Sequence, residues 1–263
     1  MCGGPFIFIF HKKAAVFRMA IYLINMDRDA DRLAHMTAQL KGLPFERLRA
    51  FDGSSLSDED LALIRAERPN ATWSRGQIGC FFSHFEAWQR IAEGEDPYGL
   101  VLEDDLHLSE GFASFAEPER MKSFPADADI IRLEATTNSV LLGPSILDID
   151  GRALRRIRSS TWCTGAYLLS KPAAAKLLSL DKSTHTVADY FLFSREYSPV
   201  PALLNIYQLT PAVAIQDKFA NPATTTFGSN IETGPGETER LTLKVLLRKV
   251  CRFLRGYRRV PVR

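Results

Sequence analysis

Short apolar runs alternate with segments of helical periodicity along most of the chain, and this alternation restricts the fold more than any other feature. Residues 20–25 and 98–102 have the length and composition of buried strands. Residues 76–88 place apolar side chains on one face of a helix. Strands that alternate with helices predict an α/β sandwich with a mainly parallel central sheet and flanking helices.

Several segments fall outside this pattern. Residues 1–18 precede the first predicted strand and are interpreted as an N-terminal extension, either disordered or a misassigned start. Residues 135–160 lack clear periodicity, and residues 216–236 are rich in Thr, Gly, Pro and Asn, so both are predicted to be loops. The expected organisation is one domain over residues 19–240 and a tail over residues 241–263.

The cysteines and the absent motifs exclude several classes of protein. The four cysteines are far apart and show no CxxC spacing, so neither a zinc site nor a disulfide framework is predicted. A reducing cytoplasm is therefore the expected compartment. The sequence contains no GxxxxGK(S/T), GxGxxG, HExxH or GxSxG motif. Phosphate-loop, Rossmann, zinc-protease and serine-hydrolase chemistry consequently have no local support.

An acidic triplet, consisting of Glu103, Asp104 and Asp105, follows the apolar run at residues 98–102. Three neighbouring carboxylates repel one another, and they stay ionised together only beside a cation or in open solvent. Divalent Mg²⁺ and Mn²⁺ prefer oxygen ligands and often share phosphate oxygens of a substrate with one or two carboxylates. The triplet therefore predicts a divalent metal site. A solvated acidic turn that caps the next helix is the alternative.

Four blocks of sequence carry a resemblance to a known family. They are residues 21–25 with Arg28, Arg32 and residues 50–53; residues 76–84; residues 101–106; and residues 165–170 with residues 187–190. In this order and spacing, over roughly residues 19–235, the chain resembles glycosyltransferase family 25, the bacterial lipooligosaccharide galactosyltransferases and their relatives. The combination of blocks is specific, whereas any one of them alone is weak.

The resemblance implies a fold, a donor and a cofactor. The fold is a single GT-A-like domain, the expected donor is UDP-galactose, and the sugar is transferred with inversion at the anomeric carbon. The resemblance also implies a bound Mn²⁺ or Mg²⁺ ion, with Asp105 as the main metal ligand. Glu103 and Asp104 would contact the ribose or reach the ion through water. The expected acceptor is a lipooligosaccharide or a related glycan.

Inversion in one step requires a base that removes the proton from the acceptor hydroxyl. Asp189 is the predicted base, because it lies between apolar and aromatic residues whose packing would raise its pKa by burial. Glu134, at the end of another predicted strand, and Asp217 are the alternatives for this role. A helix N-cap is the structural alternative for Asp189.

Polar residues that follow the first strand are predicted to contact the donor. Asn25, Arg28 and Arg32 lie where the uridine and the diphosphate would bind, and a guanidinium group fits phosphate oxygens. The structural alternative for the two arginines is a solvated helix face, paired with aspartates of the same segment. His84, at the edge of an apolar helix face, is either a structural residue or a contact to the donor.

The tail is strongly basic. It holds eight of the 33 Lys and Arg residues and no acid, which leaves 25 basic against 31 acidic residues in the rest of the chain. Apolar residues interleave with the basic ones, as in a helix that lies in an anionic membrane surface. This pattern predicts a cytoplasmic protein that is peripheral on the inner membrane, near lipid-linked acceptors. A tail packed on the domain is an alternative; nucleic acid is disfavoured as a partner because the body is acidic.

Two other functions are compatible with these residues. A metal-dependent nucleotidyltransferase would use the same acidic triplet and would release pyrophosphate. A non-catalytic sugar-binding or scaffold module would keep the fold and bind without turnover. The main prediction is a metal-dependent, inverting glycosyltransferase that uses a UDP-sugar.

Overall fold

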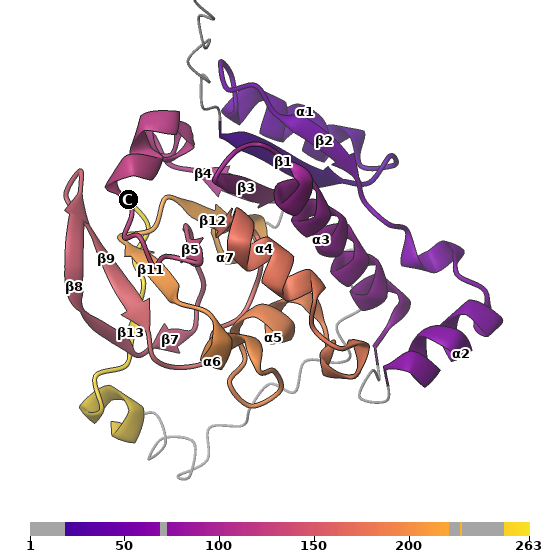
Figure 1. Cartoon of the computed structure of the whole chain (residues 1–263). Coiled ribbons are helices and arrows are strands. Elements are labelled where there is room, and N and C mark those ends of the chain that lie inside the picture. The colour runs from indigo at the N-terminus through magenta and orange to yellow at the C-terminus, as the bar shows by residue number, and fades with distance from the viewer. Residues whose placement is uncertain (1–18, 69–72, 221–226, 228–249) are drawn as a thin grey trace, which may run out of the picture.

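The protein is organised around one central sheet, as Figure 1 shows. The computed structural model describes residues 19–68, 73–220, 227 and 250–263, so the extension predicted over residues 1–18 lies outside the described residues. In spatial order the strands of this sheet are β2 (Glu46–Arg49), β1 (Ala20–Asn25), β3 (Tyr98–Glu103), β10 (Ala166–Ser170), β5 (Ile130–Arg132), β11 (Ile206–Thr210), β9 (Arg152–Ile157) and β8 (Leu142–Ile149).

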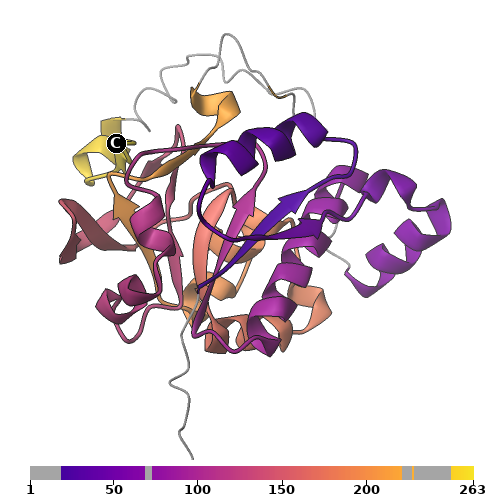
Figure 2. The same cartoon turned by 90° about the horizontal axis from the view of Figure 1, so that it is seen from above.

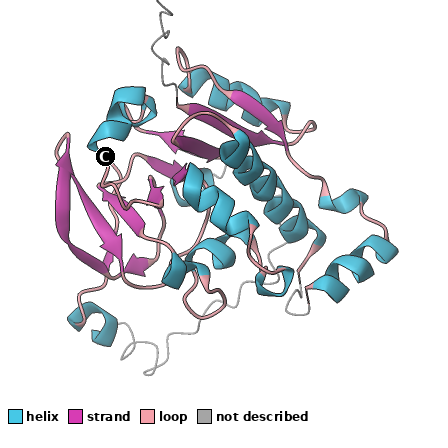
Figure 3. Cartoon of the chain, viewed as in Figure 1, coloured by secondary structure: helices cyan, strands magenta, loops and turns pink. Residues whose placement is uncertain are grey.

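The sheet is mixed. Strands β2, β1, β3, β5, β11 and β8 run in one direction, whereas β10 and β9 run in the other and pair antiparallel with both of their neighbours. The predicted α/β sandwich with flanking helices is therefore confirmed, with a shared direction for most strands (Figure 3). The two reversed strands are the departure from a mainly parallel arrangement.

Helices cover both faces of the sheet. They are α1 (Ala30–Gln39), α2 (Asp58–Glu67), α3 (Arg75–Glu93), α4 (Lys171–Leu178), α5 (Ala188–Phe193), α6 (Val200–Leu203) and α7 (Asp217–Ala220), with short 3₁₀ turns η1 (Gly53–Ser55), η2 (Ala113–Ala116), η3 (Pro118–Ser123) and η4 (Lys182–Thr184). Figure 2 shows α1 and α3 on opposite sides of the sheet.

Side chains of each strand alternate between two cores. In β1, Tyr22 and Ile24 pack into the core beneath α3, α4 and α5, while Ile21 and Leu23 pack into the core beneath α1, η2 and η3. This period of two follows from the pleat of an extended chain. Because both faces are buried, the strand reads in the sequence as a continuous apolar run.

Serine side chains cap the first turns of three helices. Ser74 and Gln77 form a reciprocal capping box at the start of α3, and Ser57 and Asp60 form another at the start of α2. The hydroxyl of Ser170 accepts a hydrogen bond at the start of α4. These interactions fix where each helix begins, and so they fix the direction in which α3 runs along the cavity.

The prediction of a long loop over residues 135–160 is wrong. The segment contains β7 (Ser139–Val140) and the antiparallel pair β8 and β9, joined by a tight turn in which Asp150 and Gly151 have positive φ. The pair lies at one edge of the sheet, and most side chains of β8 are at least partly exposed. Polar and charged residues are common on such an edge, which hides the apolar alternation.

A second, smaller sheet places the acidic triplet next to a distant segment. Its strands are β4 (Leu106–Leu108), β12 (Ala214–Gln216) and β6 (Glu134–Ala135), with β12 in the middle. The backbone N–H of Asp217 donates to the carbonyl oxygen of Asp105 at 2.8 Å. The end of β12 is therefore held against the turn between β3 and β4.

The end of the chain packs on the domain. Residues 250–254 are helical, and β13 (Arg258–Arg259) then pairs with β7, while Val260 is buried. The packed-tail alternative therefore holds for the last residues. Phe253 and Leu254 remain 60% and 76% exposed. Residues 241–249 of the predicted tail lie outside the described residues, as does the boundary at residue 240, which stays a prediction.

Within the described residues, no helix has both the length and the apolar character that crossing a membrane requires.

Candidate active site

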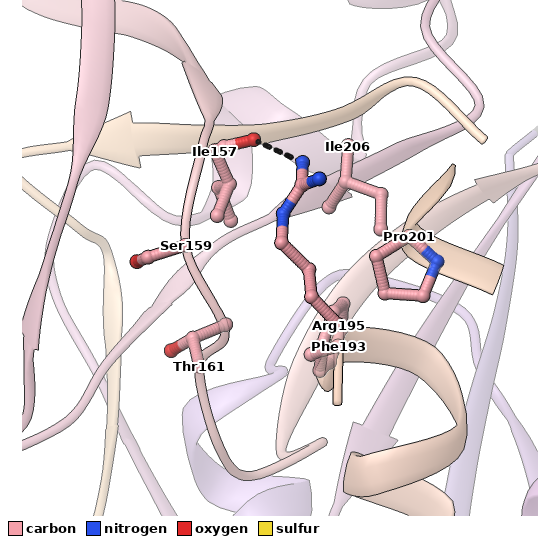
Figure 4. Close-up of a pocket in the computed structure, with 7 residues that line it drawn as sticks. All are labelled: Ile157, Ser159, Thr161, Phe193, Arg195, Pro201 and Ile206. Carbon is pink, nitrogen blue, oxygen red and sulfur yellow. Dashed lines mark hydrogen bonds between the residues drawn. The ribbon is translucent and has the colours of Figure 1, made fainter. Parts of the chain in front are cut away.

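The main cavity has a volume of about 620 Å³ and opens at the carboxyl ends of β1 and β3. This volume lies in the range of small-molecule sites, and its place at the strand ends is where α/β sheets bind ligands. A second cavity, of about 10 Å³, is enclosed by residues around Arg195, whose guanidinium donates to the carbonyl oxygen of Ile157 (Figure 4). That space holds at most one water molecule.

Most of the predicted site residues meet in the main cavity. The predicted residues that line it are Asn25, Arg28, Arg32, His84, Glu103, Asp104, Asp105 and Asp189. They come from β1, α1 and the turn before it, α3, the end of β3 and α5. The structure therefore brings together segments that are more than 150 positions apart along the chain.

Glu103 is fully engaged by the protein. Its Oε1 accepts hydrogen bonds from the Thr164 hydroxyl at 2.7 Å and lies 3.0 Å from His84 Nε2, and its Oε2 accepts from Gln216 Nε2 at 2.8 Å. Burial raises the pKa of this carboxyl, but the hydrogen bonds from His84 and Thr164 outweigh burial and lower the pKa to about 2. Glu103 therefore stays ionised and ties three elements together.

His84 belongs to a chain of buried hydrogen bonds. Trp88 Nε1 donates to the Tyr167 hydroxyl at 2.8 Å, and this hydroxyl lies 2.9 Å from His84 Nδ1. One arrangement satisfies every group: the Tyr167 hydroxyl donates to Nδ1, and Nε2–H donates to Glu103. These contacts support a structural role for His84. The residue also lines the cavity, so the predicted contact to the donor stays a prediction.

A further group of metal-ligand types includes Cys80. Single donor atoms of Cys80, His84 and Glu103 all lie within 4.8 Å of one another. Burial raises the pKa of the Cys80 thiol well above its usual value, which disfavours the thiolate that a metal would need. His84 and Glu103 are also hydrogen-bonded to each other. We therefore interpret this group as a structural cluster and not as a metal site.

Asp104 is paired with a buried guanidinium. Its Oδ1 accepts from Arg32 at 2.9 Å, and its Oδ2 accepts from Asn25 Nδ2 at 2.7 Å, with both charged side chains about nine-tenths buried. Burial raises the pKa of Asp104, although Asn25 and Arg32 oppose this effect. Arg28 pairs instead with Asp52 at the surface. Arg28 and Arg32 therefore form salt bridges with carboxylates of other segments, whereas the structural alternative pairs them with aspartates of their own segment.

Asp105 differs from its neighbours because one oxygen is left over. Its Oδ1 is buried and has no hydrogen-bond partner among the described residues. Burial and the charge of Glu103 raise the pKa of Asp105 to about 7. An unpartnered carboxylate oxygen beside a second carboxylate suits a hard divalent cation, so the residues present fit Mg²⁺ or Mn²⁺ with Asp105 as the protein ligand.

Asp189 lies in the first turn of α5 and borders the cavity. The N-cap of α5 is Val187, so the N-cap interpretation of Asp189 is wrong. Its Oδ2 accepts from the backbone N–H of Cys163 at 3.1 Å, and Cys163 itself has a positive φ of 68°. Burial raises the pKa of Asp189, although the N–H groups of Cys163 and Tyr190 oppose this effect. The direction agrees with the prediction.

The two alternative bases lie elsewhere. Glu134 is fully buried, and its Oε1 accepts from Arg132 at 3.0 Å and from the backbone N–H of Gly165 at 2.9 Å. Burial raises its pKa to about 7. Asp217 is also buried and lies 2.7 Å from His107 Nε2. Neither carboxylate is among the described residues that line the cavity, whereas Asp189 is.

An aromatic row continues from the cavity at Asp189. The rings of Trp162 and Tyr190 are 5.1 Å apart, and those of Tyr190 and Tyr197 are stacked at 5.2 Å with an angle of 11° between them. Tyr190 lines the cavity, and Tyr197 is exposed. Aromatic faces combine apolar area with polar tips, a surface suited to a sugar ring.

Sequence reasoning missed Lys218, Gln216 and Thr164, which all line the cavity. No local motif marks them. Lys218 and Gln216 lie at the start of the segment predicted as a loop, and only the pairing of β12 with β4 brings them to the acidic triplet. Their position is a long-range property of the fold.

Carboxylates, guanidinium groups and aromatic rings thus line one open cavity at the strand ends of an α/β unit. The chain belongs to glycosyltransferase family 25, because the model of that family, described as an LPS biosynthesis protein, matches residues 19–192. The resemblance noted in the sequence is thereby confirmed, and the GT-A kind of fold that it implied agrees with the mixed sheet described above.

Two relatives are named for the biosynthesis of lacto-N-neotetraose and of lipooligosaccharide. The chain is 30% identical to the lacto-N-neotetraose biosynthesis glycosyltransferase LgtB of Neisseria meningitidis serogroup A, over 76% of this chain and 75% of the relative. It is 28% identical to the lipooligosaccharide biosynthesis protein lic2B of Haemophilus influenzae, over 81% of each chain. Among solved structures, a glycosyltransferase involved in glycosylation of the major capsid of PBCV-1 aligns at 12% identity and a TM-score of 0.37, over 76% of this chain and 92% of that one.

Replacing Asp105 by Asn should stabilise the metal-free protein. The folded state raises the pKa of Asp105 from 3.8 to about 7, so the wild type loses stability as the pH rises between these values. We expect Asp105→Asn to raise the Tm by about 3–6 °C at pH 8 with a chelator present, measured by calorimetry.

At pH 4 the Asp105→Asn difference should be small, because the folded wild type is then protonated and its unfolded state is partly protonated, and it should vanish below about pH 3. The exposed Glu95 provides a control, since Glu95→Gln should leave the Tm nearly unchanged at both pH values. An Asp105→Asn effect of equal size at pH 4 and pH 8 contradicts the pKa assignment.

Proposed function

We propose that this protein transfers a hexose from a UDP-sugar, with UDP-galactose as the main donor, to a lipooligosaccharide or related glycan, and that it inverts the anomeric configuration. The observation that carries the proposal is the pair of carboxylates on one cavity: Asp105 with an unpartnered oxygen and Asp189 with a raised pKa. The family and its lipooligosaccharide relatives support the class of acceptor.

In the proposed step the acceptor hydroxyl oxygen attacks the anomeric carbon, and the bond from that carbon to the diphosphate oxygen breaks with its electron pair. Asp189 takes the hydroxyl proton, which its raised pKa favours. A divalent ion, when bound at Asp105, supplies positive charge for the departing diphosphate. Arg28, which lines the same cavity and is half exposed, would bind phosphate oxygens.

The acceptor enters, in this proposal, from the side of the aromatic row. Tyr190 follows the proposed base in α5, and Tyr197 extends the row outward. A sugar ring held against these rings would present a hydroxyl toward Asp189. Asn25, Arg32 and Asp104 also line the cavity, where their mutual hydrogen bonds keep a rigid, polar surface for the nucleotide.

We further propose that the protein works at the cytoplasmic face of the inner membrane, where lipid-linked acceptors lie. The exposed Phe253 and Leu254, flanked by Arg252 and Arg255, form an apolar and basic surface on the short helix at residues 250–254. Basic residues near an anionic membrane each contribute about 1 kcal/mol of attraction. The apolar side chains would bury in the interface.

A panel of UDP-sugars tests the main proposal. We expect free UDP from UDP-galactose in the presence of Mn²⁺ and a glycan acceptor, and a rate at least about a hundredfold lower for Asp105→Asn. Glu95→Gln serves as the control. Release of pyrophosphate would instead indicate a nucleotidyltransferase, and sugar binding without turnover would indicate a binding module; either result contradicts the proposal.

Asp189→Asn should lower kcat by about 10²–10⁴-fold and leave the Kd for UDP unchanged, because the variant removes the proton acceptor but not the nucleotide site. Single-turnover kinetics and calorimetric UDP titration measure the two quantities. Glu196→Gln, an exposed acid after the same helix, is the matched control. A kcat within threefold of the wild type would exclude Asp189 as the base.

Replacing Phe253 and Leu254 together by Ser should weaken binding to anionic vesicles at least about tenfold, since each buried apolar side chain contributes roughly 1.5–3 kcal/mol. Sedimentation with vesicles measures this change, and transfer to a water-soluble acceptor should be unaffected. Leu63, which is 68% exposed on α2, offers the control Leu63→Ser. Equal vesicle binding by wild type and double variant removes the membrane assignment.

A further inference from the structure

Lys218 lies at the acidic triplet, and its Nζ is 5.0 Å from the centroid of the Phe219 ring, with no salt bridge to any described carboxylate. It lines the main cavity together with Glu103 and Asp105, and it is exposed. The other described cations of the cavity wall are committed to carboxylates: Arg28 to Asp52, Arg32 to Asp104 and Arg75 to Asp58. Of these four described side chains, Lys218 alone forms no salt bridge.

The backbone that carries Lys218 is nevertheless fixed. Gln216 Nε2 donates to Glu103 Oε2 at 2.8 Å, and the N–H of Asp217 donates to the carbonyl oxygen of Asp105 at 2.8 Å. The Asp217 carboxylate in turn lies 2.7 Å from His107 Nε2, on β4. Residues 216 and 217 are thus bound to both sides of the triplet, which places the backbone of Lys218 beside it.

Lys218 interacts electrostatically with the carboxylates of the acidic triplet. It opposes the rise in the pKa of Asp105. Burial lowers the pKa of Lys218 itself, but nearby negative charges, those of Glu103 and Asp105 among them, outweigh burial and raise this pKa. An ammonium with an exposed head and no ion pair retains its three donors for a ligand. A ligand that suits it must be anionic and must reach the triplet.

We propose that Lys218 binds the diphosphate of the nucleotide, and that in the empty site it competes with the divalent ion for the acidic triplet. This inference rests on the proposed function. Two cations beside Asp105 repel each other, whereas a diphosphate offers oxygens to both. Nucleotide and metal therefore bind with positive coupling, and the lysine is the group that creates much of this coupling.

Calorimetric titration of Lys218→Met, Lys218→Arg and wild type tests the inference, with UDP, uridine and Mn²⁺ alone as probes. For Lys218→Met we expect UDP to bind at least about tenfold more weakly, because a charge-assisted hydrogen bond is lost. Uridine affinity should be unchanged, and Mn²⁺ alone should bind several-fold more tightly. Lys218→Arg should restore most of the UDP affinity. Lys41→Met, at an exposed lysine away from the cavity, is the control.

The opposite signs for UDP and for Mn²⁺ distinguish this role from a structural one. Unchanged UDP affinity in Lys218→Met overturns the inference, and so does an equal loss of UDP and uridine binding.

Inorganic pyrophosphate separates the two proposals. If the wild type turns over no UDP-sugar but binds pyrophosphate through Lys218, the donor assignment fails and the lysine assignment holds. If the wild type transfers sugar and Lys218→Met binds UDP normally, only the lysine assignment fails.

Discussion

Three adjacent carboxylates at the end of β3 repel one another, and the fold resolves this repulsion by giving each a different environment. Glu103 is held ionised by hydrogen bonds from Thr164, Gln216 and His84. Asp104 is neutralised by Arg32. Of these three carboxylates, only Asp105 has a buried oxygen with no hydrogen-bond partner among the described residues. Asp105 is thus the carboxylate of the triplet that the protein leaves without full compensation, and it lines the main cavity.

Local chemistry made part of this arrangement predictable. The capping boxes at Ser57 and Ser74 and the apolar run before Glu103 depend on neighbours within a few residues, and the sequence shows them directly. The hairpin at residues 142–157 was not predictable, because an edge strand with one solvated face has no continuous apolar signal. The role of Lys218 was hidden for another reason, since it depends on strand pairing across more than 100 positions.

Glu134 shows how a plausible catalytic carboxylate can serve the scaffold. It pairs with the buried guanidinium of Arg132, which also donates to the carbonyl oxygens of Trp162 and Cys163. That guanidinium fixes the loop that carries Thr164, the residue that donates to Glu103. Breaking a buried ion pair leaves an uncompensated charge, so this carboxylate is needed even though it never meets the cavity.

The short connection after residue 254 has a geometric consequence. Only residues 255–257, with Gly256 at a positive φ of 88°, separate the exposed apolar side chains from β13, which is hydrogen-bonded to the domain. A surface that binds Phe253 and Leu254 would therefore lie at a nearly fixed distance from the body of the protein. Under the proposed membrane location, this short connection would set how far a glycan must extend from its anchor for its terminal sugar to reach the cavity.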